Sequence, residues 1–395
     1  MHLTKEEEKM MNGKMGKASQ KAMEILVALG DIYGAEKLIE ISSVQIAGVS
    51  YHNLGDAGIE FLNEFAEDGH VRVLTTLNPA GMDMENWRQL GISEDFAEKQ
   101  KVVIDAFSKL GVITSCTCTP YLIGNLPRFR EHVAWSESSA VTFVNSVIGA
   151  RTNREGGPSA LAAAIVGKTP AYGLHLDENR VPDVNIDVKA RLKSVSDWGA
   201  LGYSIGKKAE NKIAYITGIK KATIDELKSF SASLVTYGAK PLFYIRNITP
   251  EKAKKPAAKI TITEDDLKEA YKAVNDEGED IDFVSIGCPH ASIAEIAEVA
   301  RLLNGRKVKT EFWITTARST KQLADLRGYT KTIEEAGAKF ACDTCLAVAP
   351  LKGRFKSVAT NSAKGCFYAR GTNQMKTKLG DTAKCIEAAV SGKWS

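Results

Sequence analysis

Three short apolar stretches, far apart along the chain, each run into cysteine. They are VITSCTC with Cys116 and Cys118, FVSIGC with Cys288, and AKFACDTC with Cys342 and Cys345. Apolar runs of this length and composition are typical of buried parallel strands. Because ligands bind outside the carboxyl ends of parallel strands, three such strand ends can bring thiolates into one crevice. The layout predicts an iron-sulfur site with three cysteine ligands and one iron open to substrate.

Other roles for these cysteines must be weighed. Cysteine is among the most buried residue types, so a single one in an apolar strand is usually part of the core. Zinc ligands are usually paired within a few tens of residues, whereas the CxC and CxxC pairs here are separated by most of the chain. Disulfides are disfavoured because nothing suggests export and a reducing cytosol keeps thiols free. Repetition of one pattern in three segments favours the cluster.

Segments with helical periodicity alternate with short β-branched runs. Helical patterns cover residues 17–34 and 96–111. Residues 38–50 are expected to pass from helix to strand, residues 70–83 to form a strand that enters a Pro/Gly turn, and residues 112–118 to form a strand. This alternation is typical of βαβ units and predicts an α/β fold with a largely parallel sheet.

The chain has 395 residues, which exceeds one typical core and predicts two or three α/β lobes. The expected division is 1–213 for the N-terminal lobes, 214–262 for a connecting α/β segment with a linker, and 263–395 for a C-terminal βαβαβ lobe. The linker is placed near residues 248–263, where Lys, Pro and Ala accumulate.

Composition excludes several classes of protein. The apolar and charged fractions are those of an ordinary globular protein. A formal charge of +4 is small for this length and gives no case for nucleic acid or an anionic membrane as a partner. The start of the chain has no apolar signal core, and no apolar stretch is as long as a membrane span. We expect a cytoplasmic protein.

Several longer strings carry a family resemblance. They are IAGVSYHNLGDAG, LTTLNPAGMD, CTCTPY, ARTNREGGPSALAAAIVGKTPAYGLH, SIGCPHAS, CDTC and TNSAKG. Together they resemble the large catalytic subunit of the aconitase X family, in order and over nearly the whole chain. The resemblance implies three aconitase-type α/β lobes around an iron-sulfur cluster. It also implies a separate small subunit that supplies the swivelling domain, because the sequence ends at Ser395 without one.

The resemblance also implies a reaction. It points to a hydro-lyase that dehydrates (R)-5-phosphomevalonate to anhydromevalonate 5-phosphate, a step of isoprenoid biosynthesis through mevalonate. An iron with an open position would act as a Lewis acid on the leaving hydroxyl and a carboxylate oxygen. Relatives that dehydrate cis-3-hydroxy-L-proline give the alternative. An electron-transfer module whose cluster is closed by a fourth cysteine, and a zinc-stabilised α/β protein, are the lower alternatives.

The family pattern assigns three of the seven cysteines as cluster ligands. These are Cys118, Cys288 and Cys345, with a 4Fe-4S cluster favoured and 2Fe-2S as the alternative. Cys116 has the same strand-face parity as Cys118 and is a substitute candidate, and Cys342 is one for Cys345. The two remaining cysteines, Cys366 and Cys385, are expected to be structural.

Two segments are predicted to bind substrate. Gly48, Val49 and Ser50 end a strand-like run, where backbone N–H groups at a tight turn can approach an anion. Asn78 and Pro79 lie where a strand turns, a position that suits an orienting amide. Simple turn chemistry is the alternative for both segments, and the resemblance favours binding.

A further group of polar residues is assigned to binding and catalysis. Ser138 is expected as a helix N-cap that also binds substrate, and Glu137 beside it as an acid or base. Of the two arginines that flank a polar loop, Arg154 is preferred over Arg151 as the clamp for carboxylate or phosphate. Lys364 is a third cation expected to meet substrate or Glu137.

The histidines give one further candidate. His290 lies two residues from a proposed ligand and is a candidate general acid, although a lone histidine is more often structural. The catalytic base is not assigned to this chain. In ordinary aconitases it is a serine of the mobile domain, so the resemblance places it on the small subunit.

Overall fold

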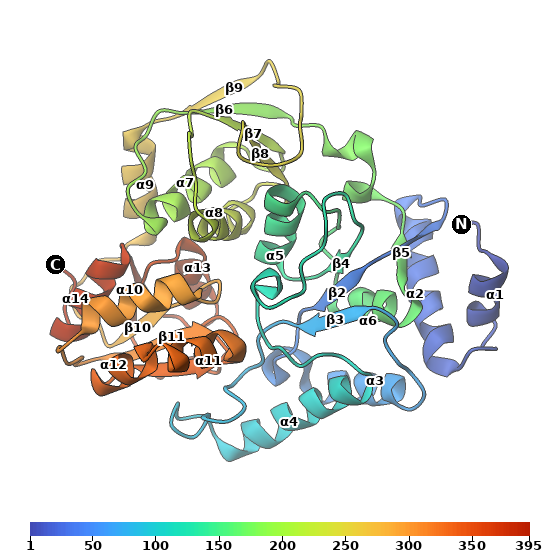
Figure 1. Cartoon of the computed structure of the whole chain (residues 1–395), viewed down its shortest axis with the longest axis horizontal. Coiled ribbons are helices and arrows are strands. Elements are labelled where there is room, and N and C mark those ends of the chain that lie inside the picture. Colours follow the sequence, from blue (N-terminus) through green and yellow to red (C-terminus); the bar gives the residue numbers. More distant parts are fainter.

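The computed structural model describes all residues from Met1 to Ser395. It contains three α/β parts, each built around its own parallel sheet (Figure 1). No helix is long and apolar enough to cross a bilayer. The predicted α/β class with parallel sheets is confirmed.

The first part surrounds a three-stranded sheet in the order β3-β2-β4. The strands are β2 (Ser43–Ile46), β3 (Leu74–Leu77) and β4 (Ala134–Trp135). An antiparallel pair, β1 (Leu38–Glu40) and β5 (Lys168–Pro170), lies at its edge. The helices are α1 (Lys5–Met11), α2 (Lys17–Tyr33), α3 (Tyr51–Ala66), α4 (Glu94–Lys109), α5 (Ser138–Phe143) and α6 (Gly157–Val166). Because α6 is apolar on all sides, it is buried between α2 and the sheet.

The second part has a four-stranded sheet in the order β8-β7-β6-β9. Its strands are β6 (Val184–Val188), β7 (Ala214–Thr217), β8 (Phe243–Ile245) and β9 (Lys259–Ile262), with helices α7 (Val195–Lys208), α8 (Ile224–Thr236) and α9 (Glu264–Val274). A boundary at residue 213 would separate β6 and α7 from the strands that they join. The expected linker near 248–263 ends in β9, which pairs with β6 in the same sheet. This part is therefore a domain of its own, and its first strand is β6.

The third part has a five-stranded parallel sheet in the order β12-β11-β10-β13-β14. Its strands are β10 (Phe283–Ile286), β11 (Glu311–Thr316), β12 (Lys339–Cys342), β13 (Ser357–Thr360) and β14 (Lys376–Leu379). Its helices are α10 (Ile293–Leu303), α11 (Arg318–Leu326), α12 (Tyr329–Glu335), α13 (Ala363–Gly371) and α14 (Thr382–Ser391). The expected βαβαβ unit corresponds to β10 through β12.

Two segments differ from expectation. Residues 38–50 hold two strands, β1 and β2, rather than a helix followed by a strand. Residues 112–118 are extended but form no strand, and only Ile113 makes an isolated bridge, to Thr76. The chain leaves this extended path at Cys116, which has a φ of 42°. Residues so displaced no longer follow the period-two alternation of a strand.

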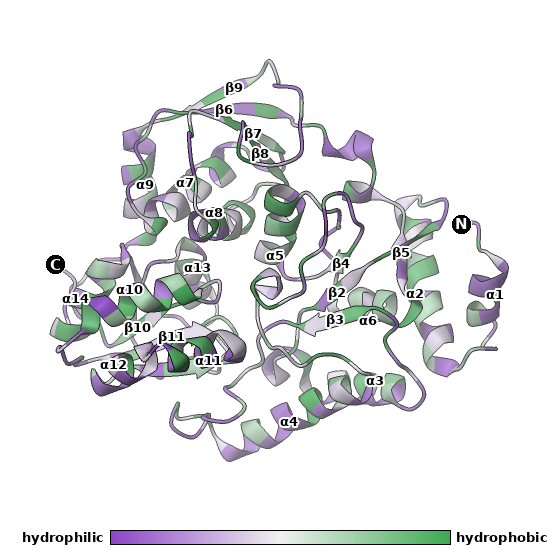
Figure 2. Cartoon of the chain, in the orientation of Figure 1, coloured by the Kyte–Doolittle hydropathy of each residue, from purple (hydrophilic) through white to green (hydrophobic).

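The three parts share hydrophobic cores where they meet. One core joins Trp135 and Phe143 of the first part to Trp198 and Phe230 of the second, and another joins the loop after β3 to the sheet of the third part. Near the centre, α8 packs against both α5 and α13 (Figure 1). Hydrophilic residues collect on peripheral elements such as α1 and α4 (Figure 2). Burial across these junctions holds the loops between the parts in fixed relative positions.

Candidate active site

A cavity of about 250 Å³ lies where loops from the first and third parts meet. Ten residues predicted for binding, metal ligation or catalysis line it: Gly48, Asn78, Pro79, Cys118, Glu137, Ser138, Arg154, Cys288, Cys345 and Lys364. The rest of the lining is Ala47, Asn53, Ser136, Pro289, Ala347, Val348, Tyr368 and Thr372. Three predicted residues, Val49, Ser50 and His290, are buried and outside the lining.

The three cysteines of the lining come from three separate turns. Cys288 follows β10 through Gly287, whose φ is 109° and whose Cβ would stand 2.0 Å from the Thr315 carbonyl oxygen. Only glycine can occupy that turn. Burial raises the pKa of all three thiols, to about 12 for Cys345. A ligand that binds them as thiolates must therefore displace their protons.

The substitute candidates lie elsewhere. Cys116 belongs to the hydrophobic core of the first part and Cys342 to that of the third. The positive φ at Cys116 breaks the strand parity that made it equivalent to Cys118. Cys366 and Cys385 are also fully buried among apolar side chains. Only one cysteine of each sequence pair faces the cavity.

The donor set fits a cluster better than a single ion. No three His, Cys, Asp or Glu side chains lie close enough together to share one metal ion. In a cluster each cysteine binds a different iron, so its ligands stand farther apart than around one ion. Three buried thiols that open on one cavity meet this requirement.

A buried ion pair forms the polar end of the cavity. The Lys364 ammonium contacts the Glu137 carboxylate and donates to Ser139 Oγ at 3.2 Å, and both charged side chains are 7% exposed. Burial opposes ionisation of Glu137, but Lys364 and hydrogen bonds from Ser139 and the Ala140 N–H lower its pKa below the ordinary value. Burial likewise opposes the charge on Lys364, and Glu137 raises its pKa. The pair is therefore held ionised.

The N-cap of α5 is one residue earlier than expected. Glu137, not Ser138, caps the helix, because its carboxylate accepts from the Ala140 N–H at 2.7 Å. Ser138 is thereby released to face the cavity, where its hydroxyl lies 3.5 Å from Lys364 Nζ and 3.4 Å from Glu137 Oε1.

The segment from Gly48 to Ser50 offers free backbone donors. Its three N–H groups make no hydrogen bond within the chain, and the segment begins at Gly48, which has a φ of 82° and lines the cavity. Ser50 is fixed by the third part of the molecule, because its hydroxyl donates to the Val348 carbonyl at 3.1 Å. Successive free N–H groups in a turn form an anion-binding concavity.

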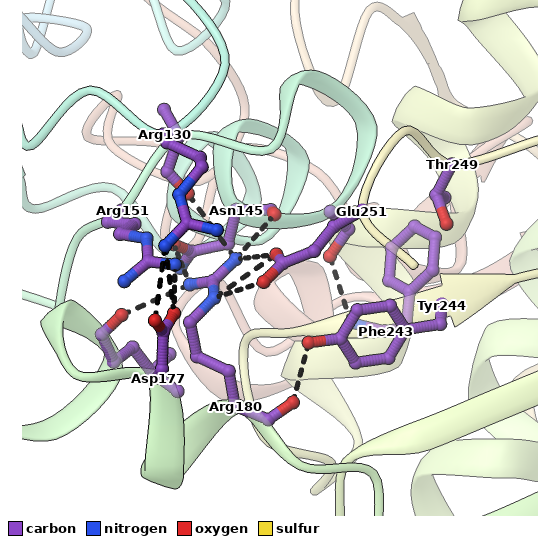
Figure 3. A network of polar contacts seen from close by, with 12 residues as sticks. Arg130, Asn145, Arg151, Asp177, Arg180, Phe243, Tyr244, Thr249 and Glu251 are labelled. Atoms are coloured by element: carbon purple, nitrogen blue, oxygen red, sulfur yellow. Dashed lines mark hydrogen bonds and ion pairs between the residues drawn. The ribbon is translucent and has the colours of Figure 1, made fainter. Parts of the chain in front are cut away.

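The two arginines of the polar loop have different environments. Arg151 is 5% exposed, pairs with Asp177 and donates to the His175 carbonyl at 3.1 Å (Figure 3). Arg154 is exposed, lines the cavity, and its side chain has no partner in the chain. Of the two, only Arg154 is available to a ligand.

His290 is surrounded by hydrogen-bonding partners. Its Nε2 donates to the Thr344 carbonyl at 2.9 Å, and its Nδ1 accepts from the Thr117 hydroxyl at 2.9 Å. Burial lowers the pKa of His290 to about 4, so the imidazole is neutral. With both ring nitrogens engaged and no exposure, the geometry favours a positioning role over proton transfer to substrate.

Sequence reasoning did not single out Gln45. This fully buried side chain on β2 donates to Asn78 Oδ1 at 3.2 Å and to the Thr117 carbonyl at 3.3 Å, and accepts from the Glu137 N–H at 3.1 Å. It thus positions three site segments at once. The only signal was a polar residue within the apolar run VQI.

Two further charged side chains, the half-buried Arg318 and the buried Lys228, hold the site loops. Arg318 on α11 pairs with Asp343 and with Asp83 of the first part. Lys228 on α8 donates to the His290 carbonyl at 3.0 Å and contacts Glu295. Both join different parts of the molecule, so no local sequence pattern indicates them.

The chain matches three family models in succession. Residues 1–178 match the aconitase X first domain, residues 182–272 the second domain and residues 281–391 the third domain. These ranges follow the three sheets of the structure, including the beginning of the second near residue 182.

Curated relatives and a solved structure are similar over the full length. The phosphomevalonate dehydratase large subunits of Methanocaldococcus jannaschii and Thermococcus kodakarensis are each 49% identical, over 100% and 98% of this chain and all of each relative. A cis-3-hydroxy-L-proline dehydratase of Pseudomonas aeruginosa is 34% identical over 97% of this chain and 69% of its own length. The crystal structure of holo-form Thermococcus kodakaraensis aconitase X has a TM-score of 0.92, 49% identity, and coverage of 98% of this chain and all of that one.

Proposed function

Because this chain belongs to the aconitase X family, we propose that it is the large subunit of a phosphomevalonate dehydratase. The reaction removes the 3-hydroxyl of (R)-5-phosphomevalonate and a proton from the carbon beside the carboxylate, which leaves a carbon-carbon double bond and water. One observation carries the proposal. The cavity combines three cysteines, a buried Glu137–Lys364 pair, free amides and a free arginine.

Cys118, Cys288 and Cys345 are the residues that would hold an iron-sulfur cluster. The holo form of the solved relative supports a bound group in this family. Once bound, a cluster with three protein ligands supplies a Lewis-acidic iron with an open position for the substrate hydroxyl. We favour 4Fe-4S over 2Fe-2S.

The other lining residues would bind and orient the substrate. Free N–H groups of Gly48, Val49 and Ser50 and the Arg154 guanidinium can bind its two anionic ends. Asn78, held by Gln45 through its oxygen, has its amide nitrogen free to donate, and Pro79 bounds the cavity beside it. Ser138 adds a hydroxyl at the Lys364 end.

Glu137 and Lys364 would handle protons at the reacting centre. Lys364 is the proton donor of the pair and Glu137 is held as the carboxylate, so together they can protonate a leaving oxygen and keep the charge balanced. The base that removes the carbon-bound proton is assigned to a small subunit with the swivelling domain. The relatives are named large subunits, which supports such a partner.

The test begins with the anaerobically purified and reconstituted full chain. Iron and acid-labile sulfide are measured, and we expect about four of each per chain. The small subunit is then added, and dehydration of 5-phosphomevalonate is compared with that of cis-3-hydroxy-L-proline. Activity with the hydroxyproline alone would overturn the substrate assignment, and zinc or no metal would overturn the mechanism.

A further inference from the structure

We propose that His290 is a positioning residue that fixes the cysteine segments relative to one another, and so controls assembly and retention of the cluster; this rests on the proposed function. His290 is fully buried and makes hydrogen bonds to residues of all three family domains. Its N–H donates to Cys118 Sγ at 3.2 Å, its carbonyl accepts from Lys228, and its ring donates to the Thr344 carbonyl.

The ring contacts determine the tautomer. The Thr344 carbonyl can only accept, so Nε2 carries the hydrogen and Nδ1 is the acceptor. The Thr117 hydroxyl must therefore donate to Nδ1, and the Thr119 hydroxyl, 3.1 Å away, donates to Thr117 Oγ1. The resulting chain of hydrogen bonds runs from the first cysteine segment, through His290, to the turn that leads to Cys345.

Lys228 fixes the same residue from the second domain. Its ammonium is 2% exposed, donates to the His290 carbonyl, and pairs with Glu295 and Asp225. Glu295 completes the capping box of α10 with Ser292, so the helix that begins after His290 is held by the same ion pair. The backbone of His290 is thus restrained at its N–H, by Cys118, and at its carbonyl, by Lys228.

The contact to sulfur gives this arrangement a chemical consequence. A backbone N–H donating to a ligand thiolate stabilises the negative charge on that sulfur, and such bonds tune the potential and lability of iron-sulfur clusters. Displacement of the His290 backbone would withdraw this bond from Cys118 and let the domains separate at the site. Loss of His290 should weaken cluster retention without removing any ligand.

Two amide substitutions test the two hydrogen bonds of the His290 ring one at a time. In His290→Asn the side-chain oxygen can replace Nδ1 as acceptor for Thr117, which restores the link between domains. In His290→Gln the amide nitrogen can replace Nε2 as donor to Thr344, a link within the third domain. His290→Ala removes both, and His175→Ala is the matched control, because His175 is equally buried but outside the cavity lining.

The experiment follows iron loss from the reconstituted full chain to a ferrous chelator. We expect His290→Ala to lose iron about 10–100-fold faster than wild type, His290→Asn to recover most of the retention, His290→Gln to recover less, and His175→Ala to match wild type. Amide hydrogen exchange of the cluster-free chain is the second measurement. Exchange of residues 115–119 should rise about tenfold in His290→Ala.

The outcomes separate this inference from the proposed function. Equal iron retention and equal exchange in wild type and His290→Ala would overturn the positioning role and leave the dehydratase proposal intact. A wild-type chain that takes up no cluster would overturn the proposed cofactor, and the exchange comparison would still decide whether His290 holds the segments together.

Discussion

Two buried groups of charged residues, one around Arg180 and one around Glu137 and Lys364, differ in what they leave unsatisfied. In the first, the Arg180 guanidinium is surrounded by Glu251, Asn145 and backbone carbonyls, and each of its nitrogens has an acceptor (Figure 3). In the second, the ion pair of Glu137 and Lys364 stands beside three free thiols and unpaired amides.

The difference identifies which cluster can act on a ligand. Arg180 has used all its donors to join the first part to the loop that carries Glu251, so it has nothing left to bind. The cavity cluster keeps unused donors and acceptors where water or ligand can enter. Buried charge alone therefore does not mark an active site, whereas buried charge beside unsatisfied groups does.

The largest expected effect concerns the cysteines. Alanine at Cys118, Cys288 or Cys345 should abolish cluster binding and activity, because each removes one of three ligands. Cys385→Ala is the control, since that thiol is buried among apolar residues of the third part. Iron analysis of the four reconstituted variants measures the result, and equal loss at all four positions would contradict the ligand assignment.

The second effect concerns proton handling. Glu137→Gln should lower kcat about 10²–10⁴-fold, because the carboxylate beside Lys364 is lost. Glu155→Gln is the control, because it makes the same change at a buried glutamate outside the cavity lining. Burial raises the pKa of Glu155 above its ordinary value. Steady-state kinetics of both variants with the small subunit present measure the difference. Similar kcat values for the two variants would remove Glu137 from the mechanism.

A third prediction tests the charged residues around Arg180, whose donors are all used within the chain. Arg180→Met should destabilise the chain by about 3–5 kcal/mol, since Glu251 is left without its buried partner. Urea denaturation gives the free energy of unfolding, and kcat measured well below the transition should be close to that of wild type. A large loss of kcat with little loss of stability would instead show that Arg180 and its partners have a catalytic role.

Arg154→Ala should have the opposite effect to Arg180→Met: it should weaken substrate binding and leave stability almost unchanged. The exposed guanidinium contributes little to folding, so the free energy of unfolding should stay within about 0.5 kcal/mol of wild type. Loss of a charged hydrogen bond to substrate should raise KM about 10–100-fold. Arg154→Lys, which keeps the charge but not the planar fork, should be intermediate. An unchanged KM would show that Arg154 does not bind the anionic group of the substrate.

The smallest effect is a pH dependence of stability. Although burial opposes its ionisation, the pKa of Glu137 in the folded chain is below the ordinary value of 4.5, owing to Lys364 and two hydrogen bonds. Its contribution to stability is therefore present above pH 4.5 and is lost as the pH falls through the folded pKa. Urea midpoints from pH 7 to pH 3 should fall more steeply for wild type than for Glu137→Gln/Lys364→Met. If the urea midpoints of the two proteins fell in parallel with pH, the predicted contribution of the Glu137 carboxylate to stability would be contradicted.

Much of the fold could be read from the sequence. The helices α2 and α4 and the βαβαβ unit of the third part follow from periodicity. The domain boundary at residue 213 was wrong, because β6 belongs to a sheet whose other strands come later in the chain. Strand pairing over such separations leaves no local mark in the sequence.

The sequence by itself determined the set of chemical groups: three cysteine segments, the turn at Gly48 and the family motifs. The family pattern already preferred one member of each pair, and only the tertiary structure gives the physical reason for that preference. Cys118 rather than Cys116 does so because the backbone leaves its extended path at Cys116. Arg154 rather than Arg151 is free because Asp177, from a distant loop, pairs with Arg151. Both choices are made by the backbone path and the side-chain contacts inside the folded first domain, which no local sequence pattern indicates.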